Sequence, residues 1–136
     1  MNSWLLTRNS NITMKDLLAI WFSIFIITSC FGKPKSTFVT VKYDKNIPEL
    51  QFAVDEFRKA GQAAGMIFSS GPDMILLNFE LDKSLAREEY QITRNGNAIL
   101  AKGGDANGLM YAGLELAENI QDGKNLHQIG NLSDKP

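Results

Sequence analysis

Residues 90–102 constrain the fold most, because they predict two strands that turn back on each other. Residues 90–94 alternate, with Tyr90 and Ile92 on one face of the expected strand and polar side chains on the other. Asn95-Gly96 follows, and this dipeptide is the strongest short signal for a two-residue hairpin of type I′, which needs positive φ at both positions. We expect the second strand over residues 98–102, antiparallel to the first.

A helix is predicted directly after this hairpin. Gly103-Gly104 turns the chain, and Asp105 is a suitable N-cap for a helix over residues 106–121. The apolar residues of this helix recur at helical spacing and form one stripe, which must lie on the sheet. The stripe consists of Leu109, Gly113, Leu116 and Ile120.

Gly103 and Gly108 have the glycine spacing of a phosphate-binding loop, but the rest of that motif is missing. Leu109-Met110 stand where the lysine and the hydroxyl residue of the motif are required, so a structural turn is the better interpretation. Gly108 and Gly113 lie inside the predicted helix, where each costs about 1 kcal/mol relative to alanine. We expect both to let the helix approach the sheet closely.

The preceding residues predict a strand, a helix and a second strand. Residues 37–43 are β-branched and aromatic, and Asn46 is a candidate cap for a helix that starts near Pro48 and ends at Gly65. Residues 74–81 form the next strand, whose apolar run over residues 74–77 predicts a central strand that is buried on both faces. The order β-α-β-β-β-α predicts a small α+β domain over residues 37–121, with about four strands and both helices on one face. The stripe of the first helix is Leu50, Ala53, Val54, Phe57, Gly61 and Ala64.

A resemblance to known families is found in three consecutive features of the sequence. These are the strand containing Tyr-x-Ile, the hairpin and the segment Gly-Leu-Met-Tyr-Ala-Gly-Leu-Glu-Leu. Gly108, Tyr111 and Leu116 approximate a tract of the N-terminal non-catalytic domain of α-glucuronidases and of the similar domain 2 of bacterial β-N-acetylhexosaminidases. The chain departs from that tract at Ala112-Gly113 and at Glu115 and Glu118. The resemblance implies an accessory domain beside a (β/α)8 barrel that holds the catalytic residues, none of which maps onto this chain.

The first 36 residues resemble an export signal followed by a tether. Met14-Lys15 precedes an apolar run over residues 17–27, which is short for a membrane span and ends in Ile27-Thr28-Ser29-Cys30. This ending resembles a bacterial lipobox, so we expect residues 1–29 to be a signal peptide, with Met14 as an alternative start. Cys30 would then carry the lipid, residues 30–36 would be the tether, and the protein would be anchored to a membrane of the bacterial cell envelope. A plain signal peptide with an incidental cysteine and a membrane-anchor helix are the alternatives.

The sequence offers little catalytic or cofactor chemistry. A net charge of −1 without a basic cluster argues against nucleic acid as a partner, and a single cysteine excludes both an intrachain disulfide and a cysteine zinc site. His127 is the only histidine and has no partner nearby in sequence for a metal or a catalytic role. Two carboxylate pairs could in principle hydrolyse glycosides, but both are expected on solvated faces, so no active site and no cofactor are predicted. The pairs are Glu88-Glu89 and Glu115 with Glu118.

The last residues, 122–136, are polar and have the composition of a linker to a catalytic barrel. We therefore expect the non-catalytic N-terminal domain of a secreted glycoside hydrolase that acts in polysaccharide breakdown. The alternative is a stand-alone surface lipoprotein that binds carbohydrate or a protein partner through the open sheet face. Exposed aromatic side chains in a flat row would favour carbohydrate, and the aromatics in question are Tyr43, Phe79 and Tyr90.

Overall fold

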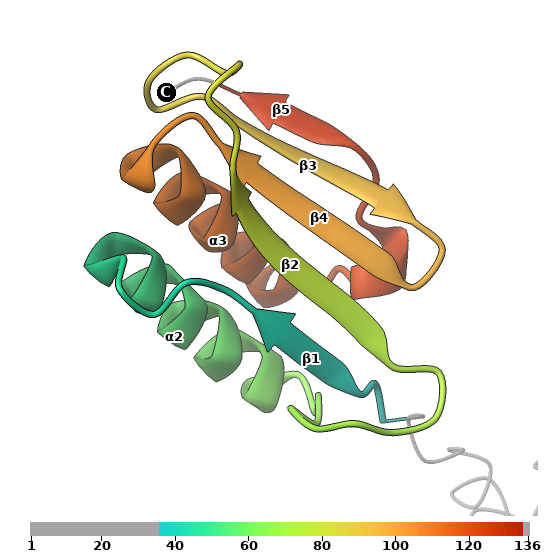
Figure 1. The fold of residues 1–136 in the computed structure, drawn as a ribbon. Helices are drawn as coiled ribbons and strands as arrows, with labels where there is room; N and C mark the ends of the chain where they lie inside the picture. Colours follow the sequence, from blue (N-terminus) through green and yellow to red (C-terminus); the bar gives the residue numbers. More distant parts are fainter. Residues whose placement is uncertain (1–35, 135–136) are drawn as a thin grey trace, which may run out of the picture. The chain divides into compact units, whose positions relative to one another are not determined.

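A five-stranded mixed sheet forms one layer of the domain, and two helices form the other (Figure 1). The computed structural model describes residues 36–134. This architecture confirms the predicted α+β class and the order β-α-β-β-β-α, to which it adds a fifth strand. The elements are β1 (Val39–Lys42), α2 (Pro48–Ala63), β2 (Ile75–Leu81), β3 (Tyr90–Asn95), β4 (Ala98–Gly103), α3 (Ala106–Gln121), the 3-10 helix η2 (Leu126–Gln128) and β5 (Leu132–Asp134).

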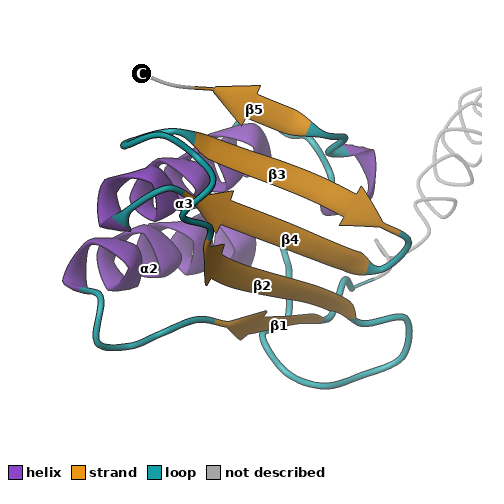
Figure 2. Ribbon diagram, turned by 45° about the horizontal axis from the view of Figure 1, so that its top comes forward, coloured by secondary structure: helices purple, strands orange, loops and turns teal. Residues whose placement is uncertain are grey.

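The strands lie in the order β1-β2-β4-β3-β5. β1, β2 and β4 run parallel, whereas β3 is antiparallel to both β4 and β5. β2 lies between β1 and β4, as expected from its apolar run. Within the described residues both helices cover the same face of the sheet, and no helix or strand covers the other (Figure 2).

The core lies between the sheet and the helices. In β2, Ile75, Leu77 and Phe79 are buried and alternate with half-buried Leu76 and Asn78. This alternation means that one face of the strand is buried, rather than the two faces that its apolar run suggested. From the helix side, Leu50, Val54 and Phe57 of α2 and Leu109 and Leu116 of α3 fill the same core.

The start of α2 differs from the prediction at one residue. The N-cap is Ile47, which has no side chain able to cap, and the Asn46 amide instead donates to the Asp44 carboxylate at 2.9 Å. Pro48 is the first helical residue, as predicted, and Gly65 follows the helix end with φ of +81°. Asn46 therefore stabilises the preceding turn and not the helix.

The hairpin is confirmed, but its turn lies one residue later than predicted. Asn95 is the last residue of β3 and pairs with Ala98, so Gly96 and Asn97 form the two-residue loop. Only Gly96 of these two has positive φ, at +57°, which fits a type II′ turn with glycine first. The Asn95-Gly96 dipeptide thus marks the hairpin without supplying both turn residues.

The tail is more ordered than a linker. Asp122 is the C-cap of α3, η2 follows, and β5 pairs with β3 through Leu132 opposite Ile92. Leu126 is fully buried and Ile129 is almost so, and both belong to the core. The segment predicted as a linker from residue 122 therefore completes the sheet and the core as far as residue 134.

The predicted signal peptide 1–29, with Met14, and Cys30 lie outside the described residues. Across residues 36–134 no helix has the length and apolar character needed to cross a bilayer.

Candidate functional site

Three predicted glycines, Gly103, Gly104 and Gly108, pack backbone against backbone at the carboxyl end of β4. A Cβ at Gly104 would collide with the Ala86 carbonyl, and one at Gly103 would collide with the backbone nitrogen of Leu109. These glycines let the loop from residue 82 to residue 89 lie directly on the start of α3. These contacts give Gly103, Gly104 and Gly108 a role in packing the loop against the helix.

Gly108 and Gly113 serve two different contacts. A Cβ at Gly108 would lie 2.5 Å from the Glu89 carbonyl oxygen, just before β3. A Cβ at Gly113 would lie 2.8 Å from the Ala53 methyl of α2 and 3.6 Å from Phe79 of β2. The close approach at Gly113 is therefore mainly between the two helices, and not between helix and sheet as predicted.

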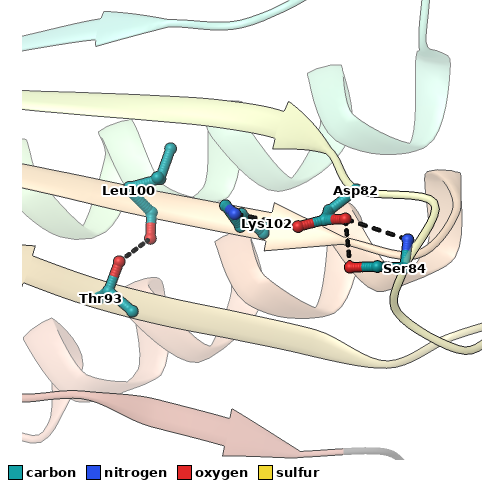
Figure 3. Close-up of polar contacts among 5 residues, drawn as sticks. All are labelled: Asp82, Ser84, Thr93, Leu100 and Lys102. Atoms are coloured by element: carbon teal, nitrogen blue, oxygen red, sulfur yellow. Dashed lines mark hydrogen bonds and ion pairs between the residues drawn. The ribbon is translucent and has the colours of Figure 1, made fainter.

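Asp82 organises the loop after β2 (Figure 3). Its carboxylate accepts from the Ser84 backbone N–H and hydroxyl and forms a 2.9 Å ion pair with Lys102 of β4. The Ser84 hydroxyl and then the Lys102 ammonium hold the pKa of Asp82 well below its usual range. In turn, the carboxylate raises the pKa of Lys102, so both groups are charged at neutral pH and hold each other in place.

Asp105 performs the N-cap role that the sequence predicts. Its Oδ1 accepts from Gly108 N at 2.9 Å and from Glu88 N at 3.2 Å, and Arg87 lies 3.6 Å from Oδ2. The bond from the Gly108 amide is the main reason that the pKa of Asp105 is lowered. The carboxylate thus joins the loop, at Glu88, to the first turn of α3.

The two carboxylate pairs considered for glycoside hydrolysis are largely used in local hydrogen bonds. Glu89 accepts from Ala86 N, and Glu88 accepts from the Asn107 amide at 3.4 Å. Glu115 accepts from the Asn119 amide one turn later on α3, at 2.7 Å, and Glu118 is exposed to solvent. This arrangement stabilises the loop and the helix and brings no pair of carboxylates together across a cleft.

The three aromatic residues proposed for a carbohydrate platform do not form a row on the open sheet face. Phe79 and Tyr90 are each 6% exposed and face the helices. Tyr43 is partly buried and lies under the Arg58 guanidinium, 5.7 Å from the ring centre. The open face instead has a small half-buried apolar centre, Leu76 and Leu100, with polar side chains around it: Asn78, Glu80, Gln91, Thr93 and Lys102.

A polar pocket lies at the opposite end of the strands, beside the hairpin turn. Its volume is ≈ 280 Å³, and its wall comes from the start of β1, the loop before β2, the turn between β3 and β4, and η2. The wall contains hydroxyl, amide, carboxylate and imidazole groups and only one apolar residue. The lining residues are Ser36, Thr37, Pro72, Asp73, Asn97, Asn125 and His127.

Arg94 joins this pocket's hairpin to the tail. Its Nε donates to the Gly96 carbonyl at 2.9 Å, Nη1 donates to the Leu126 carbonyl at 2.6 Å, and Nη2 lies 3.0 Å from Nδ1 of His127. The backbone N–H of Arg94 also donates to the Asn131 side chain at 3.1 Å. Within residues 36–134, the guanidinium makes no ion pair with a carboxylate.

Sequence reasoning missed this arrangement because His127 has no chemical partner nearby in the chain. Its partner, Arg94, is 33 residues away. One signal was present: Arg94 follows Tyr90 and Ile92 at period two, so a charged residue occupies the face that should be apolar. Among the described residues no three His, Cys, Asp or Glu side chains are grouped so that they could hold a metal ion.

Searches with the sequence match no family model and no curated protein. Among solved structures, the chain is similar to a GH138 enzyme targeting pectin rhamnogalacturonan II, with a TM-score of 0.55 and 24% sequence identity. The similarity covers 73% of this chain and 11% of the enzyme's chain. The domain therefore shares its fold with a small part of a much longer glycoside hydrolase.

Proposed function

We propose that this chain is a non-catalytic accessory domain of a secreted glycoside hydrolase that degrades a polysaccharide. The observation that carries the proposal is the shared fold, which covers most of this chain and only a small part of a glycoside hydrolase. An accessory role agrees with the local hydrogen bonds that the carboxylates of Glu88, Glu89 and Glu115 accept. In these positions none of the three is placed as an acid or base beside a cleft. We further propose that this hydrolase is similar to the α-glucuronidases or to the β-N-acetylhexosaminidases, as the resemblance of residues 90–120 implies.

The catalytic partner would be a (β/α)8 barrel that packs on the open sheet face. Both helices lie on the other face, so Leu76 and Leu100 remain half-buried at the centre of a surface that the described elements leave uncovered. Polar side chains around this centre match the usual anatomy of a contact between domains, with an apolar middle and a polar rim. The domain would then support or position the catalytic barrel without performing the reaction.

The DNA downstream of the Pro136 codon tests the proposal most directly. We expect the reading frame to continue into a sequence with the strand-helix repeat of a (β/α)8 barrel. A stop codon immediately after Pro136 would contradict it and favour the alternative, a stand-alone surface lipoprotein.

The absence of catalysis is tested with the chain itself. We expect the full-length chain to hydrolyse no aryl glucuronide and no aryl N-acetylhexosaminide above the buffer rate. Turnover that is lost in Glu89→Gln but kept in Glu118→Gln, a change at an exposed position on α3, would show that an acid or base is present after all.

The docking face is tested in the enzyme that contains the barrel. Leu100→Arg places a charge at the apolar centre of the open face and should lower the thermal midpoint of the whole enzyme. Gln51→Arg, on the exposed side of α2, is the control and should leave it unchanged. Equal effects of the two substitutions would argue against docking through the sheet.

The proposal also includes export and lipid attachment at Cys30, so that the enzyme is held at the cell envelope. Labelled palmitate should enter the wild-type protein and should not enter Cys30→Ala. Equal labelling of the two proteins would leave a plain signal peptide or a membrane-anchor helix as the explanation of the apolar run.

A further inference from the structure

We propose that the pocket between the β3–β4 turn and η2 binds one ring of a neutral sugar through its hydroxyl groups. Its volume, ≈ 280 Å³, lies just below the range of sites for drug-sized molecules, which begins at about 300 Å³. A single sugar ring is a ligand of suitable size for such a space. The pocket is also separate from the open sheet face, so a domain packed on that face would leave it to a ligand.

Two asparagine side chains offer unused hydrogen-bonding groups to this pocket. Asn97 makes no side-chain hydrogen bond within residues 36–134, and its position in the turn leaves the amide exposed. Asn125 uses its Oδ1 to accept from His127 N at 2.9 Å, which fixes the side chain and leaves the two hydrogens of its Nδ2 without a partner in the described chain. Amides that both donate and accept are well suited to adjacent hydroxyl groups of a sugar.

The imidazole of His127 is oriented by Arg94. A guanidinium has only donors, so at 3.0 Å its Nη2 donates to Nδ1, and the ring proton is then on Nε2. Nε2–H is left to donate to a ligand. Because the same guanidinium also holds the carbonyls of Gly96 and Leu126, the turn and η2 are fixed relative to each other before a ligand arrives.

The composition of the wall decides which ligand fits. No phenylalanine, tyrosine or tryptophan side chain lines the pocket, so recognition would depend mainly on hydrogen bonds and not on stacking against a large ring face. No lysine or arginine side chain lines the pocket to pair with a carboxylate or a phosphate, which disfavours uronic acids and sugar phosphates. The wall alone indicates a hydroxyl-rich neutral ligand, and the choice of a sugar rests on the proposed function.

Nuclear magnetic resonance with the full-length 15N-labelled chain tests the inference. The probes are methyl β-D-galactopyranoside and methyl α-D-mannopyranoside, with sodium glucuronate as the anionic comparison and glycerol as a non-sugar polyol. We expect at least one of the two neutral glycosides to shift the side-chain amide signals of Asn97 and Asn125 and the backbone signal of His127, and to bind more tightly than glucuronate or glycerol. No shift at these residues with either glycoside, or equal binding of glycerol, would overturn the inference.

Substitutions in the hairpin provide the matched comparison. Asn97→Ala should weaken binding about fivefold to tenfold, the effect of losing one neutral hydrogen bond, whereas Asn95→Ala in the same hairpin should bind like the wild type. His127→Ala is a second, independent variant that should also weaken binding of the glycoside. Wild-type affinity in both Asn97→Ala and His127→Ala would place the ligand elsewhere and overturn the inference.

This test can fail independently of the proposed function. If the downstream reading frame encodes a barrel and no glycoside binds, the accessory role stands and the pocket assignment is wrong. If a glycoside binds and the frame stops after Pro136, the pocket assignment stands and the chain is not part of a larger hydrolase.

Discussion

Leu126→Ala tests whether the tail after α3 is part of the folded domain or a separable linker. Leu126 is 0% exposed, although it lies in a polar segment of the sequence. The substitution removes three carbon atoms, whose transfer from water is worth roughly 2.4 kcal/mol at ~0.8 kcal/mol per methylene group. A residual cavity adds to this, so we expect the free energy of unfolding to fall by about 3 kcal/mol.

Urea unfolding of the full-length chain, followed by circular dichroism, measures this loss. With a slope of about 2 kcal/mol/M, a loss of 3 kcal/mol lowers the midpoint by roughly 1.5 M. Leu81→Ala is the matched control, because it removes the same atoms from a side chain that is 52% exposed. The control should cost less than about 1 kcal/mol, since little apolar surface returns to water.

A loss at Leu126 no larger than the loss at Leu81 would refute the reasoning. It would mean that η2 detaches at little cost and that the tail is a linker, as its composition suggests. An unchanged slope in urea is also expected, because the unfolded surface differs by only one side chain.

Further predictions concern a close approach and two titrating groups. Gly108→Ala should cost about 1–3 kcal/mol in thermal or urea unfolding, because the added methyl would lie 2.5 Å from the Glu89 carbonyl oxygen, whereas Gly130→Ala, with open space around it, should be close to neutral. Burial and then nearby carboxylates raise the pKa of Tyr90 to about 12 from 10.0, so the native state should lose about 2 kcal/mol of stability as the pH rises from 10 to 12. Tyr90→Phe should remove this loss in alkaline urea titrations, and an unchanged pH profile would contradict it. Because the pKa of Asp82 is lowered in the folded state, its contribution is present above about pH 4 and disappears as the pH falls further, so Asp82→Asn should destabilise the protein at pH 7 and make little difference in acid.

Local patterns in the sequence predicted most of the elements because their signals lie within a few residues of each other. Asp105 caps α3, and its bond to Gly108 N spans three residues. The hairpin was also predictable, but the turn slipped by one residue because the pairing of Asn95 with Ala98 is set by the register of β3 on β4. Asn46 is not the cap because the helix begins at Pro48, which makes Ile47 the N-cap and leaves Asn46 in the preceding turn, bonded to Asp44.

The role of the tail and the pocket could not be predicted in this way. Leu126, Ile129 and Leu132 are too few and too irregularly spaced to predict burial. The first two become core residues, and Leu132 packs against the core, only because η2 and β5 contact distant parts of the chain. His127 likewise gains its partner from β3, through a bond that spans 33 residues. The open face is a related case: alternation in β3 identifies the apolar face with Tyr90 and Ile92, but only the packing of both helices on that face leaves the other uncovered (Figure 2).

The sequence by itself determined the α+β class, the boundaries of β3, β4 and α3 to within a residue or so, and the glycines at the close approaches. These properties depend on backbone preferences and on periodic burial, which act over one turn or one strand. Only the tertiary structure decided that the last segment is a fifth strand, that Gly113 meets α2, and that Arg94 holds His127 beside a polar pocket. Those contacts join residues far apart in the chain, and their stability comes from packing that exists only once the layers have assembled.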